Sequence, residues 1–357
     1  MKHDVMRTLA EARPDELTPG APDAATRENE LTRAMASSRL PAKRRVRPAW
    51  GLGLVAAAAA AALVATALHQ PGDPSAPSVA QPPLTARSLL LGAAEKAEAE
   101  PAASGTYWHI QTVQRGYYRA GGYTIVTEER SDEYAPTKPG LKMWGRQQYL
   151  GARPATPADV TAWKKAGAPT TFKVSIPVGP GAKMTKPAVF ATAPGKPTVS
   201  SSDLVDGNKI YWLGRNVTYK DLSVLPADPA RLKASLLRWY TGHSTEALSV
   251  RQPSDEWLFD VTAGLITAMP VTPKVRAAAF RMLADLKTIE ASGPVTDSQG
   301  RKGTAVTATT RTSKGTVQKR LIIDTQGRPL ARDTLLAGAP HTSTTITKIT
   351  WTNHTPR

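Results

Sequence analysis

Apolar and small residues form an unbroken run at positions 50–68, and no Asp, Glu, Lys or Arg occurs between positions 48 and 70. A helix of these 19 residues would be roughly 28 Å long, close to the thickness of the hydrocarbon core of a bilayer. Seven consecutive alanines at 56–62 make the run only weakly apolar. We predict one transmembrane helix over residues 48–69; the alternative is a signal peptide that is cleaved after residues 65–67.

The residues that flank this run indicate its orientation. A basic cluster and one aromatic residue stand at its N-terminal side: Lys43, Arg44, Arg45, Arg47 and Trp50. The C-terminal side has no Lys or Arg before Arg87. The positive-inside rule therefore predicts a cell-membrane protein with a cytoplasmic N-terminus and an extracytoplasmic C-terminal domain, and it places Trp50 at the membrane interface.

The segments on either side of the predicted span are short. Residues 1–47 contain two amphipathic stretches, at 3–12 and 23–37, and neither could bury much apolar surface alone. We predict a cytoplasmic tail with two short helices, which either lies on anionic lipid or docks on a cytosolic partner. Five prolines in residues 70–84 predict an extended stalk.

Residues 85–357 change to a pattern typical of a packed domain. A helix is expected over 86–99, followed by amphipathic strands, then three helices, then a meander of strands with glycine turns. The expected strands are 105–115, 123–130, 141–150, 209–213, 304–312, 316–324, 329–336 and 344–352, and the expected helices are 228–240, 255–268 and 273–289. The predicted fold is α+β, an antiparallel sheet with helices on one face. Proline and glycine interrupt the pattern at 167–202, where we predict a flexible loop or lid.

Charge and composition narrow the chemistry. The 357 residues carry a formal charge of +17, of which +15 belongs to residues 85–357. Because that part is expected outside the membrane, the natural partners are anionic wall polymers or lipid head groups, and nucleic acid is not expected. The absence of cysteine excludes disulfides, thiolate metal sites and thiol nucleophiles.

No pattern of catalytic residues occurs in the chain. The six histidines have no metal-ligand spacing, and the sequence lacks a nucleophile elbow, an acylation motif and a phosphate-binding loop. We therefore expect no enzyme, no metal and no cofactor. Four aromatic residues on the first expected strand could line a groove for a sugar or lipid, with cross-strand packing as the alternative: Tyr107, Trp108, Tyr117 and Tyr118.

Two segments carry a family resemblance. Residues 269–306 (MPVTPKVRAAAFRMLADLKTIEASGPVTDSQGRKGTAV) and 319–333 (KRLIIDTQGRPLARD) resemble a family of uncharacterised actinobacterial single-pass membrane proteins, as do 9–17, 25–36 and 225–236. Members are often encoded beside extracytoplasmic-function sigma factors, so the resemblance implies such a sigma factor as a cytosolic partner. The order of helices and meander is also similar to half-barrel lipid carriers and to the sigma-regulator sensors built on that fold.

These features predict a single-pass membrane protein with an extracytoplasmic binding or sensing domain, a membrane-tethered regulator of a sigma factor. The cysteine-containing zinc cluster of common anti-sigma domains cannot form here, so regulation would have to run through the two tail helices. The alternative is a carrier-like domain that holds a lipid or acyl chain. An apolar cavity on the order of several hundred Å³ would favour the carrier, and a filled interface between helices and sheet would favour partner binding.

Overall fold

The computed structural model describes residues 85–177, 185–212, 215–245, 250–312 and 315–356, which belong to one compact unit, Ser78–Arg357. The predicted tail, span and stalk lie outside the described residues, and so do the flanking residues Lys43, Arg44, Arg45, Arg47 and Trp50. Among the helices that are described, none has both the length and the apolar character needed to cross a membrane.

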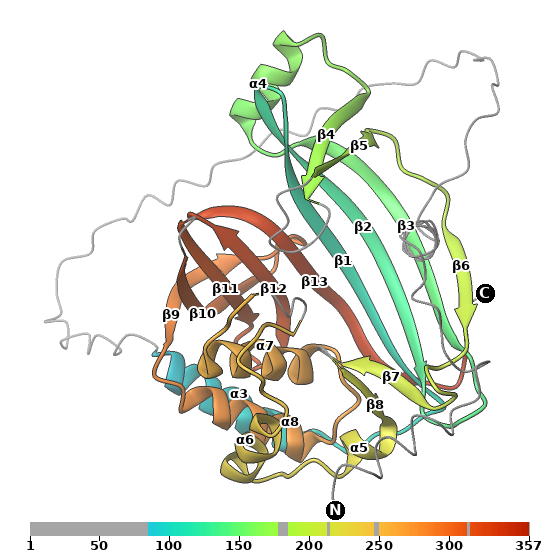
Figure 1. Ribbon diagram of the computed structural model, residues 1–357, viewed down its shortest axis with the longest axis vertical. Coiled ribbons are helices and arrows are strands. Elements are labelled where there is room, and N and C mark those ends of the chain that lie inside the picture. Colours follow the sequence, from blue (N-terminus) through green and yellow to red (C-terminus); the bar gives the residue numbers. More distant parts are fainter. Residues whose placement is uncertain (1–84, 178–184, 213–214, 246–249, 313–314, 357) are drawn as a thin grey trace, which may run out of the picture. The chain divides into compact units, whose positions relative to one another are not determined.

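Nine antiparallel strands form the main sheet, in the order β6-β3-β2-β1-β13-β12-β11-β10-β9 (Figure 1). Their bounds are β1 Tyr107–Ala120, β2 Tyr123–Pro136, β3 Met143–Pro154, β6 Thr198–Ser202, β9 Ile289–Thr296, β10 Lys302–Thr312, β11 Gly315–Ile323, β12 Pro329–Leu336 and β13 Ala339–Thr352. The first and last strands, β1 and β13, pair along most of their length. This pairing joins strands β1–β3 and strands β9–β13 into one sheet. The predicted α+β class with a large antiparallel sheet is confirmed.

The region expected as a loop, 167–202, contains three strands, so that prediction was wrong for its described part. β4 (Thr171–Pro177) and β5 (Thr185–Ala191) form a separate hairpin, and β6 joins the edge of the main sheet. Phe172 and Val174 are buried against Tyr123 and Ile125 of β2. The alternating apolar residues of β4 thus decide its structure. The prolines described in this region lie in loops, at the end of β4 or on β5, where a missing N–H is tolerated.

Six helices are described, and short polar caps begin most of them. They are α3 Ala86–Ala99, α4 Pro157–Lys165, α5 Tyr219–Ser223, α6 Pro229–Leu237, α7 Ser254–Thr267 and α8 Pro273–Ala284. Asp228 and Thr272 cap α6 and α8, each followed by proline at the first helical position, as the sequence predicts. The expected helix 273–289 is shorter in the structure, because α8 ends at Ala284 and Ile289 already begins β9. A second small hairpin, β7 (Lys209–Trp212) with β8 (Arg215–Thr218), precedes α5.

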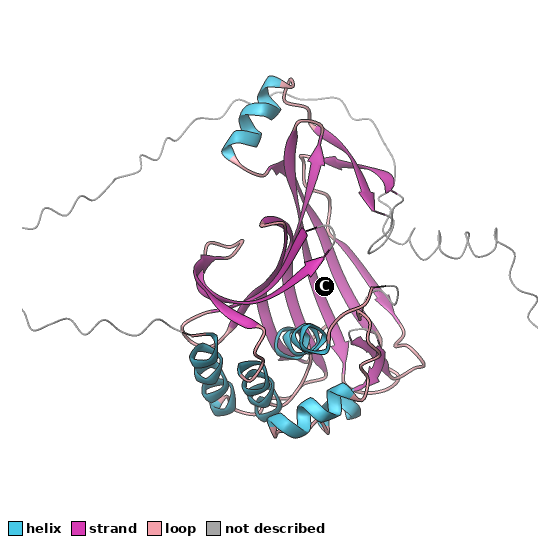
Figure 2. Cartoon of the chain, turned by 60° about the vertical axis from the view of Figure 1, so that its left-hand side comes forward, coloured by secondary structure: helices cyan, strands magenta, loops and turns pink. Residues whose placement is uncertain are grey.

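The core lies between the helices and the β10–β11 end of the sheet. Helix α7 is buried on nearly every side, and α3 packs along α8 through Leu90, Ala93 and Ala97. Alternation along β10 and β11 places Val306 and Leu321 in this core, while their neighbours form a second buried cluster with β12: Ala305, Ile322, Leu330 and Ala331. This part of the sheet is therefore buried on both faces, and Figure 2 shows it curling most strongly there.

Two turns of the meander share one sequence pattern, Asp-Xaa-Gln-Gly-Arg, at 297–301 and 324–328. In each turn the aspartate accepts hydrogen bonds from the backbone N–H groups of the third and fifth residues and from the arginine Nε. Gly300 and Gly327 take the left-handed conformation that both turns require, with φ of 78° and 75°. The two turns thus have the same local structure in different surroundings.

Candidate functional site

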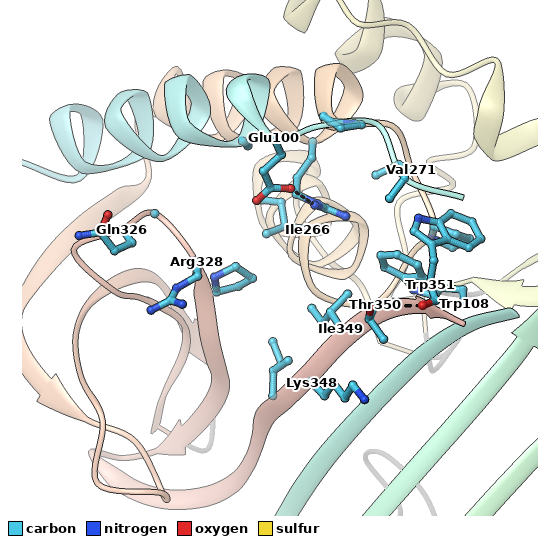
Figure 3. Close-up of a pocket in the computed structure, with 18 of the residues that line it drawn as sticks. Glu100, Trp108, Ile266, Val271, Gln326, Arg328, Lys348, Ile349, Thr350 and Trp351 are labelled. Carbon is cyan, nitrogen blue, oxygen red and sulfur yellow. Dashed lines mark hydrogen bonds and ion pairs between the residues drawn. The ribbon is translucent and has the colours of Figure 1, made fainter. Parts of the chain in front are cut away.

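A partly open cavity of about 1070 Å³ lies where the C-terminal end of α3, the α7–α8 connection, the 324–328 turn and strand β13 meet (Figure 3). Much of its wall is apolar. Its large apolar and aromatic side chains are Trp108, Tyr219, Ile266, Val271, Phe280, Leu330, Ile346, Ile349 and Trp351. The helix–sheet interface is therefore not completely filled at this point.

Aromatic rings from three elements form one wall of the cavity. Trp108 of β1 is buried, and its Nε1 donates a hydrogen bond to the Ala268 carbonyl at the end of α7, at 2.8 Å. Its ring meets Trp351 of β13 edge to face, with the centroids 4.9 Å apart, and Trp351 in turn meets Tyr219 of α5. These contacts fix the wall by joining strand, helix and loop.

Arg276 of α8 is the most enclosed basic side chain in the wall. It is 13% exposed, and its Nη1 pairs with Glu100 Oε2 at 2.8 Å. Its guanidinium carbon lies 5.9 Å from the centre of the Trp108 ring. Burial lowers the pKa of Arg276 and Glu100 opposes that shift. Its Nε is buried and has no acceptor among the described residues, so the charge is only partly compensated.

The other charged residues of the wall come from the 297–301 and 324–328 turns, from β10 and from β13. Arg301 pairs with Asp297 and Arg328 with Asp324, each within its own turn. Two further lysines line the cavity, Lys302 and Lys348, and neither has an acidic partner among the described residues. The wall thus combines apolar rings with an excess of positive charge.

Only one of the four predicted groove residues lines this cavity. Trp108 lines it. Tyr107 and Tyr117 belong to the opposite face of β1, because successive side chains of a strand alternate between the two faces of a sheet. Tyr118 stacks on Phe190 of β5, with the centroids 5.1 Å apart, and burial raises its pKa. The structure therefore does not bring the four residues together around this cavity.

Three residues of the cavity wall were not predicted as site residues: Trp351, Tyr219 and Arg276. The register of β1 and β13 brings Trp108 opposite Trp351 across more than 240 positions of the chain, and a pattern of local alternation contains no such information. The sequence pattern alone predicts that Arg276 is exposed on its helix. In the folded domain, α3 packs beside α8 and Arg276 is enclosed.

A smaller cavity of about 300 Å³ lies beside the first and shares Tyr219 and Pro270 with it. Its wall includes Lys138, Leu204 and Ile210. Within the described ranges, no group of three or more His, Asp or Glu side chains has an arrangement that could hold a metal ion. Binding through shape, apolar contact and charge is the chemistry that these surroundings provide.

Comparison with protein-family models and with curated proteins gives no match for this chain. The family resemblance and its sigma-factor partner thus stay predictions from the sequence, and the functional argument rests on the geometry of the cavity.

Proposed function

We propose that residues 85–357 form a binding module for a lipid or other single-chain amphiphile, with the apolar part of the ligand in the cavity beside Trp108 and Trp351. The observation that carries the proposal is the cavity itself, about 1070 Å³, with apolar and aromatic side chains on one part of its wall and charged and polar side chains on the rest. Small-molecule sites have volumes of about 300–1,000 Å³, so this cavity is large enough to hold an amphiphile.

The fold supports the same proposal. A curved antiparallel sheet with helices beside it is the arrangement of half-barrel lipid carriers, with which the order of elements already agreed. A membrane anchor over residues 48–69 would place such a module beside its source of ligand. Regulation of a sigma factor through residues 1–47 remains a prediction from the sequence, with ligand binding outside as the signal to be reported.

Photo-crosslinking with a neutral probe tests the proposal. The full chain in lipid nanodiscs would be illuminated with dodecanol that carries a diazirine, and labelled peptides would be mapped. We expect labels on 266–280 and 346–351. Ala103→Trp should remove them, because exposed Ala103 lines the cavity and a bulky ring there would fill it.

Ala99→Trp is the matched control, since Ala99 is exposed on nearby α3 and does not line the cavity. This variant should keep the labels on both segments. If the two variants label alike, or if neither cavity segment of the parent chain is labelled, the cavity does not bind the probe and the proposal is wrong.

A further inference from the structure

We infer that the ligand of this cavity carries an acidic head group, a carboxylate or phosphate, which binds Arg276 in place of Glu100. The inference rests on the proposed function and deepens it by naming the chemical class of the ligand. Its basis is the ion pair of Arg276 and Glu100 in the cavity wall, which the dashed line from Glu100 marks in Figure 3.

The first observation is that Arg276 has more donors than acceptors. A guanidinium has five N–H groups, and the described residues supply Arg276 with one side-chain acceptor, Glu100. The Nε group is enclosed without a partner, and the side chain is held between α8 and the Trp108 ring. Because this buried guanidinium is already incompletely paired, loss of its one carboxylate partner is costly, and an anionic acceptor is needed in the place that Glu100 occupies.

The second observation is the asymmetry between the two partners. The Arg276 side chain is 13% exposed, whereas that of Glu100 is 47% exposed. Glu100 is the C-terminal cap of α3, and residues 101–104 follow it along the cavity without helix or strand. Glu100 can therefore turn into water at small cost, while Arg276 stays in the wall. The acidic head group of the ligand then takes the place of the Glu100 carboxylate, so that Arg276 still has an anionic partner.

The third observation is the charge of the wall as a whole. Five basic and two acidic side chains line the cavity. Arg301 and Arg328 are neutralised within their own turns, but Lys302 and Lys348 are not paired with a carboxylate in the described part of the chain. The resulting positive potential favours an anionic ligand over a neutral ligand of equal shape, and salt weakens this preference.

A second ion pair between the same helices provides a matched control. Arg281 of α8 pairs with Glu98 of α3, with side chains 31% and 45% exposed. Neither residue lines the cavity. Removal of this pair should affect the packing of α3 on α8 about as much as removal of the Arg276 pair, without any effect on a head group.

The test compares two probes that differ only in the head group, diazirine-bearing dodecanoic acid and dodecanol, on the full chain in nanodiscs. We expect the acid to label the cavity segments at about tenfold lower concentration than the alcohol, the factor that one charge-assisted hydrogen bond provides. Arg276→Gln should remove this preference and leave labelling by the alcohol within about twofold. Glu100→Gln should increase labelling by the acid several-fold. Arg281→Gln should leave labelling by both probes unchanged.

The outcomes separate the inference from the proposed function. Equal labelling by acid and alcohol in the parent chain, or an undiminished preference for the acid in Arg276→Gln, would overturn the acidic head group while the cavity still binds amphiphiles. No labelling by either probe would overturn the proposed function. Unchanged labelling by the alcohol shows that the Arg276→Gln variant is folded. Dodecyl phosphate that carries a diazirine should also label the cavity segments at lower concentration than the alcohol, and Arg276→Gln should remove this difference. If only the carboxylic acid is preferred over the alcohol, the head group is restricted to carboxylates.

Discussion

Gly327 lies so close to Ala93 that a Cβ at position 327 would be 2.8 Å from the Ala93 Cα. Ala93 is 1% exposed and faces the turn from α3. The turn between β11 and β12 therefore rests directly on the helix, and both elements contribute to the cavity wall, through Gln326 and Ala97. Because Gly327 has no side chain, the turn between β11 and β12 can pack directly on α3.

Gly327→Ala should destabilise the domain by about 2–4 kcal/mol, because a left-handed conformation disfavours a side chain and the methyl group would overlap Ala93. Gly300→Ala is the control. Its φ of 78° matches the 75° of Gly327, yet no atom lies within 4 Å of a Cβ there, so the expected loss is about 1–2 kcal/mol. Urea unfolding of both variants measures the difference. Equal losses would show that the contact with Ala93 does not matter.

Trp108→Phe should lower the free energy of unfolding by about 1–3 kcal/mol more than Trp351→Phe. Both changes remove the same part of an indole ring from the aromatic wall. Only Trp108 donates a hydrogen bond to the Ala268 carbonyl, which the phenyl ring would leave without its partner. Thermal or chemical unfolding of the two variants tests this, and a Trp351→Phe loss as large as that of Trp108→Phe would contradict it.

The described part of the fold was predictable where a short pattern decides the structure. Asp228 and Thr272, each before a proline, mark the starts of α6 and α8, and the glycine turns mark the meander at 302–336. The hairpin β4–β5 was missed because its strands lie among prolines and glycines, and its burial depends on β2, which is distant in sequence.

The cavity could not be predicted in this way. It needs the pairing of β1 with β13, which brings Trp108 opposite Trp351, and it needs α3 beside α8, which encloses Arg276. Each depends on contacts between distant segments, whereas periodicity reports only which side chains share a face. The excess of positive charge was visible in the sequence, but its concentration around a cavity was not.

Phe172→Ala tests whether β4 belongs to the folded domain. Phe172 is 1% exposed in the cluster that β4 forms with β2, so its truncation should cost about 3–5 kcal/mol of unfolding free energy. Val189→Ala, on the paired strand β5 at 62% exposure, should change stability by less than about 0.5 kcal/mol. Urea unfolding provides both values. A negligible effect of Phe172→Ala would restore the interpretation of this region as a loop.

The last prediction concerns alkaline pH. Tyr149 donates a hydrogen bond to the Ala191 carbonyl at 2.7 Å, and burial raises its pKa from 10.0 to about 12. Because the folded pKa lies above the unfolded one, the stabilisation is complete below pH 10 and is lost as the pH rises toward 12. Tyr149→Phe should therefore be about 1 kcal/mol less stable at neutral pH, and this deficit should shrink above pH 10. Urea midpoints of both proteins across that range measure it, and a constant deficit would contradict the raised pKa.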